Sequence, residues 1–452
     1  MNSGGKKPNI FIIGVDALRA KNLDCYGYER SISPNIDLLA KQGVLFENAF
    51  SVGNQTDCSI AALFSGLYIE PFVDLWSYDN LFVKALEKKG YTTYEIGMHS
   101  SAAYSPMEKI LNSFEERVDA SENRKRKVYK KIMRKFRAGS LPHRIVRKVY
   151  EAKRELLFTK QTLKNCRRDA EKITEAAINA FSNVKQPFFM FLFYPDLHYP
   201  YNPPREYIEE MKKCPLRGED DIETSEILQK LLIPLYRNHI RWNLMNDTYA
   251  SQVINRYDAT VRYVDTQIGR LLKTVEELGF SDDTIIILLS DHGESFIEHE
   301  IFFEHHGLYD VSIQIPLILR YSELSKNKKI EGLVQNIDVF PTIMDLLDLN
   351  IEGDGKSLLP LIEEGKEIRP AVYAMENGWR YGCCLRTKQW KYIYHHSEQG
   401  AYCNFCGRVH GELEELYDLE IDPGETQNVI SDNSEMADGL KKQVSKKFIS
   451  IL

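Results

Sequence analysis

At two places in the sequence, residues of types that commonly bind metals directly follow an apolar run. Asp16 ends the first run, and the pair Asp291–His292 ends another one. Two carboxylates and an imidazole suit Mn²⁺ or Zn²⁺ best, Mg²⁺ also, and Ca²⁺ less well because of the histidine. Taken singly, an Asp after a strand is more often a helix cap, and a lone His is more often structural. The repeated placement indicates a site for one divalent metal ion.

The apolar runs have the length of buried β-strands. They span Asn9–Val15, Phe188–Tyr194 and Thr284–Ser290, and His198 lies shortly after the second of them. Apolar residues at helical spacing predict an amphipathic helix over Tyr257–Leu278. Strands that alternate with helices predict a mostly parallel sheet covered on both faces, with ligands at the carboxyl ends of the strands. We therefore expect the three strand ends to meet in one site.

The rest of the chain adds two features to this α/β pattern. Residues 8–365 are predicted to form the catalytic domain, with a single second strand over Val44–Phe50. Residues 370–452 are predicted to form a small C-terminal subdomain of antiparallel strands and a final helix. A basic helical insert is expected at about residues 122–172.

Charge is concentrated in that insert. The net charge of the chain is −7, yet residues 121–170 hold 18 Lys/Arg against 4 Asp/Glu, which leaves −21 on the remainder. Such a segment is either a solvated helical pair or a surface for an anionic polymer or membrane. It lacks interleaved aromatic residues, so no nucleic-acid partner is expected.

Six short motifs follow one another along the chain. They are PNIFIIGVDALR (8–19), SPNIDLLA (33–40), GVLFENA (43–49), SDHGESFIEH (290–299), HGLY with IPLI (306–318) and ELYDLEIDPGE (415–425). In this order they resemble the sulfatase family of the alkaline-phosphatase superfamily, over about residues 8–430. The resemblance implies the sulfatase-like α/β sandwich around a mostly parallel sheet, and a metal-dependent hydrolase or transferase.

The nucleophile motif departs from that family. Counting back from Ser65–Gly66 places Thr56, and not Cys58, at the nucleophile position. Ile60 stands where the family has the arginine that accompanies formylglycine, and Ala17 replaces a second aspartate. The resemblance therefore implies an unmodified threonine nucleophile beside a single metal ion.

The remaining roles are also implied by the resemblance. His198 matches a histidine that protonates the leaving group or holds its oxygen, and His306 matches one that contacts the transferred group. The implied site consists of Asp16, Thr56, Asp291 and His292 for the metal, Thr56, His198 and His306 for catalysis, and Asn54, His99 and His305 for substrate binding.

We expect a hydrolase of phosphoesters, a phosphodiester or phosphonate ester, acting through Thr56. One alternative is hydrolysis of sulfuric esters, and another is transfer of a phospho-alcohol group to a glycan. A metal-bound binding protein without catalysis is a further alternative. The expected partner is an anionic ester substrate, carried on a glycan or a lipid.

The cysteines and the apolar runs bear on a second metal and on localisation. Of eight cysteines, Cys383, Cys384, Cys403 and Cys406 gather, with His410 close behind, which predicts either a structural zinc or buried thiols. No run reaches the roughly 20 apolar residues of a membrane span. The first run does not resemble a signal peptide, so a cytoplasmic protein is expected.

Overall fold

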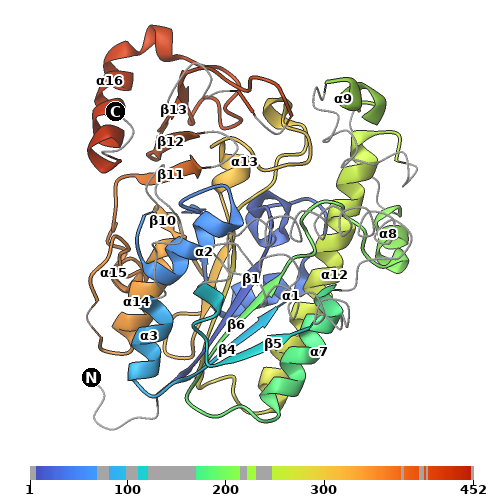
Figure 1. Cartoon of the computed structure of the whole chain (residues 1–452), viewed down its shortest axis with the longest axis vertical. Helices are drawn as coiled ribbons and strands as arrows, with labels where there is room; N and C mark the ends of the chain where they lie inside the picture. Colours follow the sequence, from blue (N-terminus) through green and yellow to red (C-terminus); the bar gives the residue numbers. More distant parts are fainter. Residues whose placement is uncertain are drawn as a thin grey trace, which may run out of the picture.

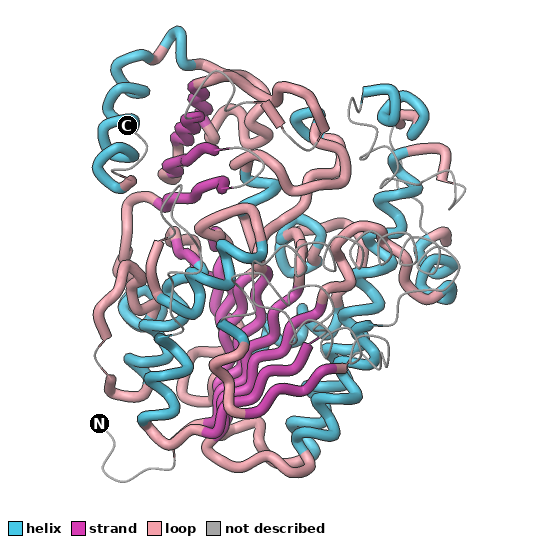
Figure 2. The backbone as a smooth tube through the Cα atoms, viewed as in Figure 1, coloured by secondary structure: helices cyan, strands magenta, loops and turns pink. Residues whose placement is uncertain are grey.

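The computed structural model describes residues 7–68, 81–97, 110–120, 169–213, 221–230, 247–349, 351–377, 381–395, 402–403 and 406–448. Its centre is a twisted eight-stranded sheet between two layers of helices (Figures 1 and 2). A four-stranded antiparallel sheet lies beyond one end of the large sheet and packs beside the last helix. The predicted α/β sandwich with a small antiparallel C-terminal sheet is confirmed.

The large sheet has the strand order β5-β4-β6-β1-β7-β8-β2-β9. All neighbouring pairs are parallel except those that β8 makes with β7 and β2. Its strands are β1 (Asn9–Val15), β2 (Val44–Phe46), β4 (Thr92–Gly97), β5 (Glu116–Asp119), β6 (Phe188–Tyr194), β7 (Thr284–Ser290), β8 (Leu317–Arg320) and β9 (Lys328–Ile330).

Two smaller sheets complete the strands. β3 (Ala49–Phe50) pairs with β10 (Val334–Gln335). The C-terminal sheet contains β11 (Val372–Asn377), β12 (Tyr381–Arg386), β13 (Trp390–His395) and β14 (Glu414–Asp418) in sequence order.

Helices cover both faces of the large sheet. One face carries α1 (Pro34–Gln42), α7 (Asp169–Phe181), α8 (Arg205–Met211) and α12 (Ala250–Glu277). The other carries α2 (Thr56–Ser65), α3 (Leu81–Lys88) and α14 (Val339–Leu346). The described residues also form the α-helices α9 (Thr224–Lys230), α13 (Asp310–Ile313), α15 (Leu359–Glu364) and α16 (Ser434–Lys447).

Strand β1 shows why this sheet is buried on both sides. Side chains alternate along a strand, and Ile10 and Ile12 enter the core under α2 and α3. Phe11 and Ile13 enter the core under α7 and α12. Because both faces are covered, every residue of β1 is apolar or fully buried, which explains the continuous run in the sequence.

Some predicted boundaries are wrong. The single strand expected over Val44–Phe50 is split between two sheets, because the chain turns at Glu47–Asn48 and the Asn48 amide donates to the carbonyl of Glu331 over 2.8 Å. The last residues assigned to the basic insert, 169–172, belong to helix α7. Residues 121–168, which hold the insert's charge, lie outside the described residues.

A buried ion-pair cluster joins the C-terminal sheet to the catalytic part. Lys391 on β13 is fully buried, with its Nζ 2.7 Å from Asp310 Oδ1 and 2.6 Å from Glu425 Oε1. The backbone N–H of Met375 on β11 donates to the carbonyl of Val52 over 2.9 Å.

None of the helices in the described ranges is long and apolar enough to cross a membrane. Cytoplasmic localisation stays a prediction.

Candidate active site

Strand register brings the two carboxylates of the site together. Val15, the last residue of β1, pairs with Ser290, the last residue of the parallel strand β7. The next residues, Asp16 and Asp291, therefore leave the sheet side by side although they are far apart in the sequence. The Ser290 hydroxyl reinforces this end of the sheet by donating to the carbonyl of Val15 (2.7 Å).

The metal ligands predicted from the sequence converge. Ligand atoms of Asp16, Asp291 and His292 lie within 4.8 Å of one another, and all three residues are buried. His292 Nε2 is 3.5 Å from Asp16 Oδ1, 3.5 Å from Asp291 Oδ2 and 3.3 Å from Thr56 Oγ1. The four predicted ligands thus surround one point at the carboxyl end of the sheet.

The protonation of His292 suits a metal ligand. Its Nδ1 lies 2.7 Å from the carbonyl of Gly293, so Nδ1 carries the proton and donates it there. Burial lowers the pKa of the imidazole, although the neighbouring carboxylates act to raise it. Nε2 therefore presents a lone pair toward two carboxylates and the Thr56 hydroxyl.

This donor set fits one divalent cation. Among the described residues the buried Asp291 Oδ2 has no hydrogen-bond partner, and it faces the lone pair of His292 Nε2 across 3.5 Å. Buried acceptors that face one another are unfavourable unless a cation lies between them. Two carboxylates, an imidazole and a hydroxyl match Mn²⁺ or Zn²⁺ better than Ca²⁺, and the identity of the metal stays a prediction.

A strained turn holds Asp16 in place. Ala17 has φ of 54°, a left-handed conformation that costs free energy in any residue with a Cβ. Its N–H donates to Asp291 Oδ1 over 3.1 Å, and its carbonyl accepts from the Tyr257 hydroxyl over 2.7 Å. Helix α12 thus fixes the turn through Tyr257, a role that the sequence did not indicate.

Thr56 and Cys58 lie in different surroundings on helix α2. Thr56 is the first residue of the helix and is half-buried, with its hydroxyl at the metal ligands. Cys58 is 1% exposed and belongs to the apolar core, where burial raises the pKa of its thiol to about 12. This geometry supports Thr56 as nucleophile, which stays a prediction.

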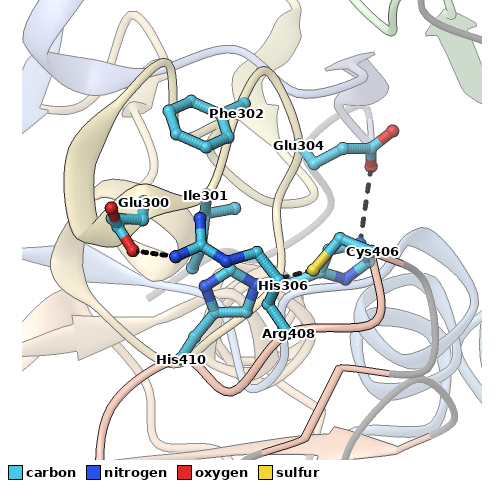
Figure 3. A pocket seen from close by; sticks show the side chains of 8 residues that line it. All are labelled: Glu300, Ile301, Phe302, Glu304, His306, Cys406, Arg408 and His410. Atoms are coloured by element: carbon cyan, nitrogen blue, oxygen red, sulfur yellow. Dashed lines mark hydrogen bonds and ion pairs between the residues drawn. The ribbon is translucent and has the colours of Figure 1, made fainter. Parts of the chain in front are cut away.

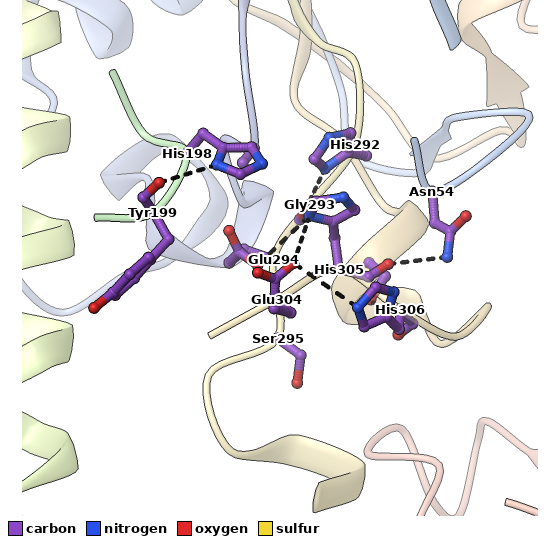
Figure 4. A network of polar contacts seen from close by, with 12 residues as sticks. Asn54, His198, Tyr199, His292, Gly293, Glu294, Ser295, Glu304, His305 and His306 are labelled. Atoms are coloured by element: carbon purple, nitrogen blue, oxygen red, sulfur yellow. Dashed lines mark hydrogen bonds and ion pairs between the residues drawn. The ribbon is translucent and has the colours of Figure 1, made fainter. Parts of the chain in front are cut away.

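Histidines line one side of the site (Figure 4). The ring of His305 lies 4.1 Å from that of His292 and 5.6 Å from that of His198. His198 is half-buried, and its Nδ1 lies 3.1 Å from the carbonyl of Tyr199. His305 is buried, and burial lowers its pKa to about 3, so it is neutral.

His306 lies beyond His305 as seen from the metal ligands. Its ring is 5.8 Å from that of His305, and it lines a small pocket shared with Cys406 and His410. The ring of His305, by contrast, lies against that of the metal ligand His292. A catalytic role of His306 remains a prediction.

Two further polar residues shape the site. Asn54 donates its amide to the carbonyls of His305 (2.9 Å) and Gly307 (3.1 Å), so it holds the histidine loop in place. Glu294, for which the sequence indicated no role, is 1% exposed and lies 3.8 Å from His305 Nδ1. Burial raises the pKa of Glu294 to about 8, against the effect of His198. His99 lies outside the described residues.

The predicted four-cysteine zinc site is wrong in composition. Cys383 and Cys384 are consecutive on β12, so their side chains point to opposite faces and enter two different apolar clusters. Cys403 and Cys406 lie in a third cluster, where their thiols form a ligand group with His410.

Comparison with known proteins identifies the family. Residues 8–349 match the Sulfatase family, and residues 298–451 match the C-terminal family of N-sulphoglucosamine sulphohydrolase. An arylsulfatase of Clostridium perfringens is 25% identical, over 98% of this chain and 94% of that protein. An N-acetylglucosamine-6-O-sulfatase of Bacteroides thetaiotaomicron is 24% identical, over 94% and 83%.

Other relatives match only in part. A sulfatase of Formosa agariphila is 26% identical over 54% of this chain, and the chain spans 46% of that protein. For arylsulfatase K of Rattus norvegicus the shares are 42% and 34%. Among solved structures, the phosphonate monoester hydrolase of Agrobacterium radiobacter has a TM-score of 0.73 and 21% identity, covering 99% of this chain and 96% of that one. The fold and the match over residues 8–349 together show that the chain belongs to the sulfatase family of hydrolases.

Proposed function

We propose that the protein is a metal-dependent hydrolase of sulfuric esters carried on a sugar. The observation that carries this proposal is the joint placement of Asp16, Asp291, His292 and Thr56 at the carboxyl end of a sulfatase-fold sheet. The matches over nearly the whole chain to an arylsulfatase and an N-acetylglucosamine-6-O-sulfatase support sulfate as the transferred group. The second of these names supports a carbohydrate as its carrier.

The residues of the site support a two-step displacement. A divalent cation bound here would lower the pKa of the Thr56 hydroxyl and offset charge on the transferred group. Thr56 Oγ attacks sulfur and releases its proton to water, while the bond from sulfur to the sugar oxygen breaks and that oxygen departs with a proton from His198. Water then attacks the sulfur of sulfated Thr56 and gives one proton to His198; the bond from sulfur to Thr56 Oγ breaks, Oγ takes up a proton from water, and sulfate is released.

His305 and Asn54 would prepare the site for the anionic group. The low pKa of His305 keeps it neutral, so one ring nitrogen can donate to an ester oxygen without adding a charge. Asn54 fixes the backbone that carries His305, and it therefore acts as a positioning residue.

A second candidate is hydrolysis of a phosphodiester or phosphonate ester at the same site. Thr56 is the observation that favours it, because a threonine cannot become a formylglycine and acts instead through its hydroxyl. Cys58 is too deeply buried in the described core to replace it.

A substrate screen separates the two candidates. Purified protein is assayed with aryl sulfate, aryl phosphate, bis-aryl phosphate and aryl phosphonate, each with Mn²⁺, Zn²⁺, Mg²⁺ or Ca²⁺. The proposal predicts the highest kcat/KM for the sulfate ester, and release of sulfate from a sulfated N-acetylglucosamine. Preference for a phosphorus ester by more than tenfold would favour the second candidate.

Paired variants on α2 test the nucleophile. Thr56→Ala should lower kcat by about a thousandfold or more, because it removes the attacking oxygen, whereas Thr56→Ser should keep partial activity. Cys58→Ala is the matched control and should stay near wild type in turnover. Substantial activity in the Thr56→Ala protein would refute the mechanism under either substrate class.

A further inference from the structure

A second group of metal-binding side chains lies in the C-terminal part, apart from the site described above. The thiols of Cys403 and Cys406 and the imidazole of His410 place their ligand atoms within 4.8 Å of one another. Cys406 Sγ is 2.9 Å from His410 Nε2 (Figure 3). Cys403, Cys406 and His410 are each at most 4% exposed. Neither cysteine forms a disulfide within the described part of the chain.

The backbone around these residues forms a tight reversal. The N–H of Cys403 donates to the carbonyl of Arg408 (2.7 Å), and the N–H of Gly407 donates to the carbonyl of Cys403 (2.9 Å). Gly407 has φ of 78°, a conformation that favours glycine, and Tyr402 bridges Val409 in antiparallel fashion. The turn thus brings two thiols that are three residues apart to one point.

The chemistry of this group distinguishes it from other buried thiols of the chain. Cys58, Cys383 and Cys384 lie in apolar clusters and belong to none of the ligand groups among the described residues. Two thiolates and an imidazole form a soft to borderline donor set, which selects Zn²⁺ over Mg²⁺ or Ca²⁺.

We propose that Cys403, Cys406 and His410 bind a Zn²⁺ ion that is distinct from the metal of the active site. Zinc in proteins is usually four-coordinate. Its fourth ligand here would be water or Glu304, which lines the pocket between the two sites together with His306 and Cys406.

The position of the group suggests what the ion does. Arg408 Nη2, inside the turn, pairs with Glu300 Oε2 over 2.5 Å, so the turn is tied to the segment that leads to His305 and His306 (Figure 3). His305 in turn lies against His292. Zinc would fix the turn against the segment that carries His305 and His306, and its three ligands would act as positioning residues.

Cobalt spectroscopy of the full-length protein tests the site. After metal removal under reducing, anaerobic conditions, Co²⁺ is added, and thiolate ligation is read from its charge-transfer band in the near ultraviolet. We expect the band in wild type and in Asp291→Asn, because the active site contributes no thiolate. It should disappear in Cys403→Ser and Cys406→Ser, and persist in the control Cys25→Ser.

A measurement on wild-type protein makes the test independent of how well the variants fold. Zinc loaded into the protein should be released into a colorimetric indicator when a mercurial reagent blocks the thiols. The inference is overturned if Co²⁺ gives no thiolate band in wild type, or if blocking the thiols releases no zinc. A Cys403–Cys406 disulfide in anaerobically purified protein would overturn it as well.

Discussion

Asp291→Asn should stabilise the metal-free protein while removing its metal site. Asp291 Oδ1 accepts the N–H groups of Ala17 (3.1 Å) and His292 (2.9 Å), and an amide oxygen can accept both. Oδ2 faces the lone pair of His292 Nε2 across 3.5 Å, and an amide nitrogen there can donate to that lone pair. The substitution therefore turns an unfavourable contact into a hydrogen bond.

The expected size follows from Coulomb's law. Ligand atoms of Asp16 and Asp291 lie within 4.8 Å, and two unit charges at that separation repel by about 3 kcal/mol at an effective dielectric constant of about 20. Because water and ions relax part of this repulsion, we expect the free energy of unfolding to rise by about 1–3 kcal/mol in EDTA. A metal at 100 times its Kd stabilises wild type by about 2.7 kcal/mol. Added metal should therefore narrow or reverse the difference in free energy of unfolding between Asp291→Asn and wild type.

Urea unfolding followed by tryptophan fluorescence, in EDTA and in Mn²⁺ or Zn²⁺, measures both effects. Asp258→Asn is the matched control, since this buried carboxylate accepts hydrogen bonds from three donors, Arg30 (2.5 Å), Tyr28 and Asn22. The control should lose stability with and without metal. A loss of stability in EDTA for Asp291→Asn, or equal stabilisation of it and wild type by metal, would refute the reasoning.

Three further perturbations test other parts of the structure. Burial lowers the pKa of His299 to about 4, so below about pH 6.5 the unfolded chain binds up to one more proton than the folded one, and the free energy of unfolding falls toward pH 4 by up to about 1.4 kcal/mol per pH unit. His299→Asn should flatten this pH dependence in unfolding curves, and an unchanged pH dependence would contradict the lowered pKa of His299. Lys391→Met should lower the free energy of unfolding, measured in urea, by about 3–5 kcal/mol, because it leaves Asp310 and Glu425 without their buried cation. Adding Glu425→Gln should recover part of this loss, and a loss below about 1 kcal/mol would show that the ion pairs are dispensable. Gly293→Ala would place a Cβ 2.1 Å from the backbone carbonyl oxygen of Val311. It should therefore lower turnover, and lower the free energy of unfolding by about 1–3 kcal/mol. Wild-type values for both would contradict this close packing.

The elements that hold the metal ligands could be predicted because they are buried on both faces. The bounds expected for β1, β6 and β7 agree with the structure, since no polar residue interrupts those runs. Strand β2 could not be separated from β3, because the turn at Glu47–Asn48 depends on a distant carbonyl.

Side-chain direction was harder to predict than the position of the elements. The spacing of the cysteines suggested one group, whereas Cys383 and Cys384 enter different cores. A strand sends neighbouring side chains to opposite faces, so the two thiols cannot share one site. Glu294 stood within a recognised motif, but only the packing around it shows that its pKa is raised. Asn54 is similar, because its amide donates to a loop some 250 residues away.

The central position of β1 has a consequence for how this protein is made. Phe188, which begins the first neighbouring strand β6, lies 179 residues after Asn9. At about 5–20 residues per second, a ribosome needs about 10–40 s to synthesise that stretch, and β7 follows later still. During this time a strand that is apolar apart from Asn9 has neither of its partners, so we expect the nascent chain to depend on chaperones. Asp16 lies near the start of the chain and Asp291 follows β7, so the ion can find its ligands together only after β7 and His292 have left the ribosome.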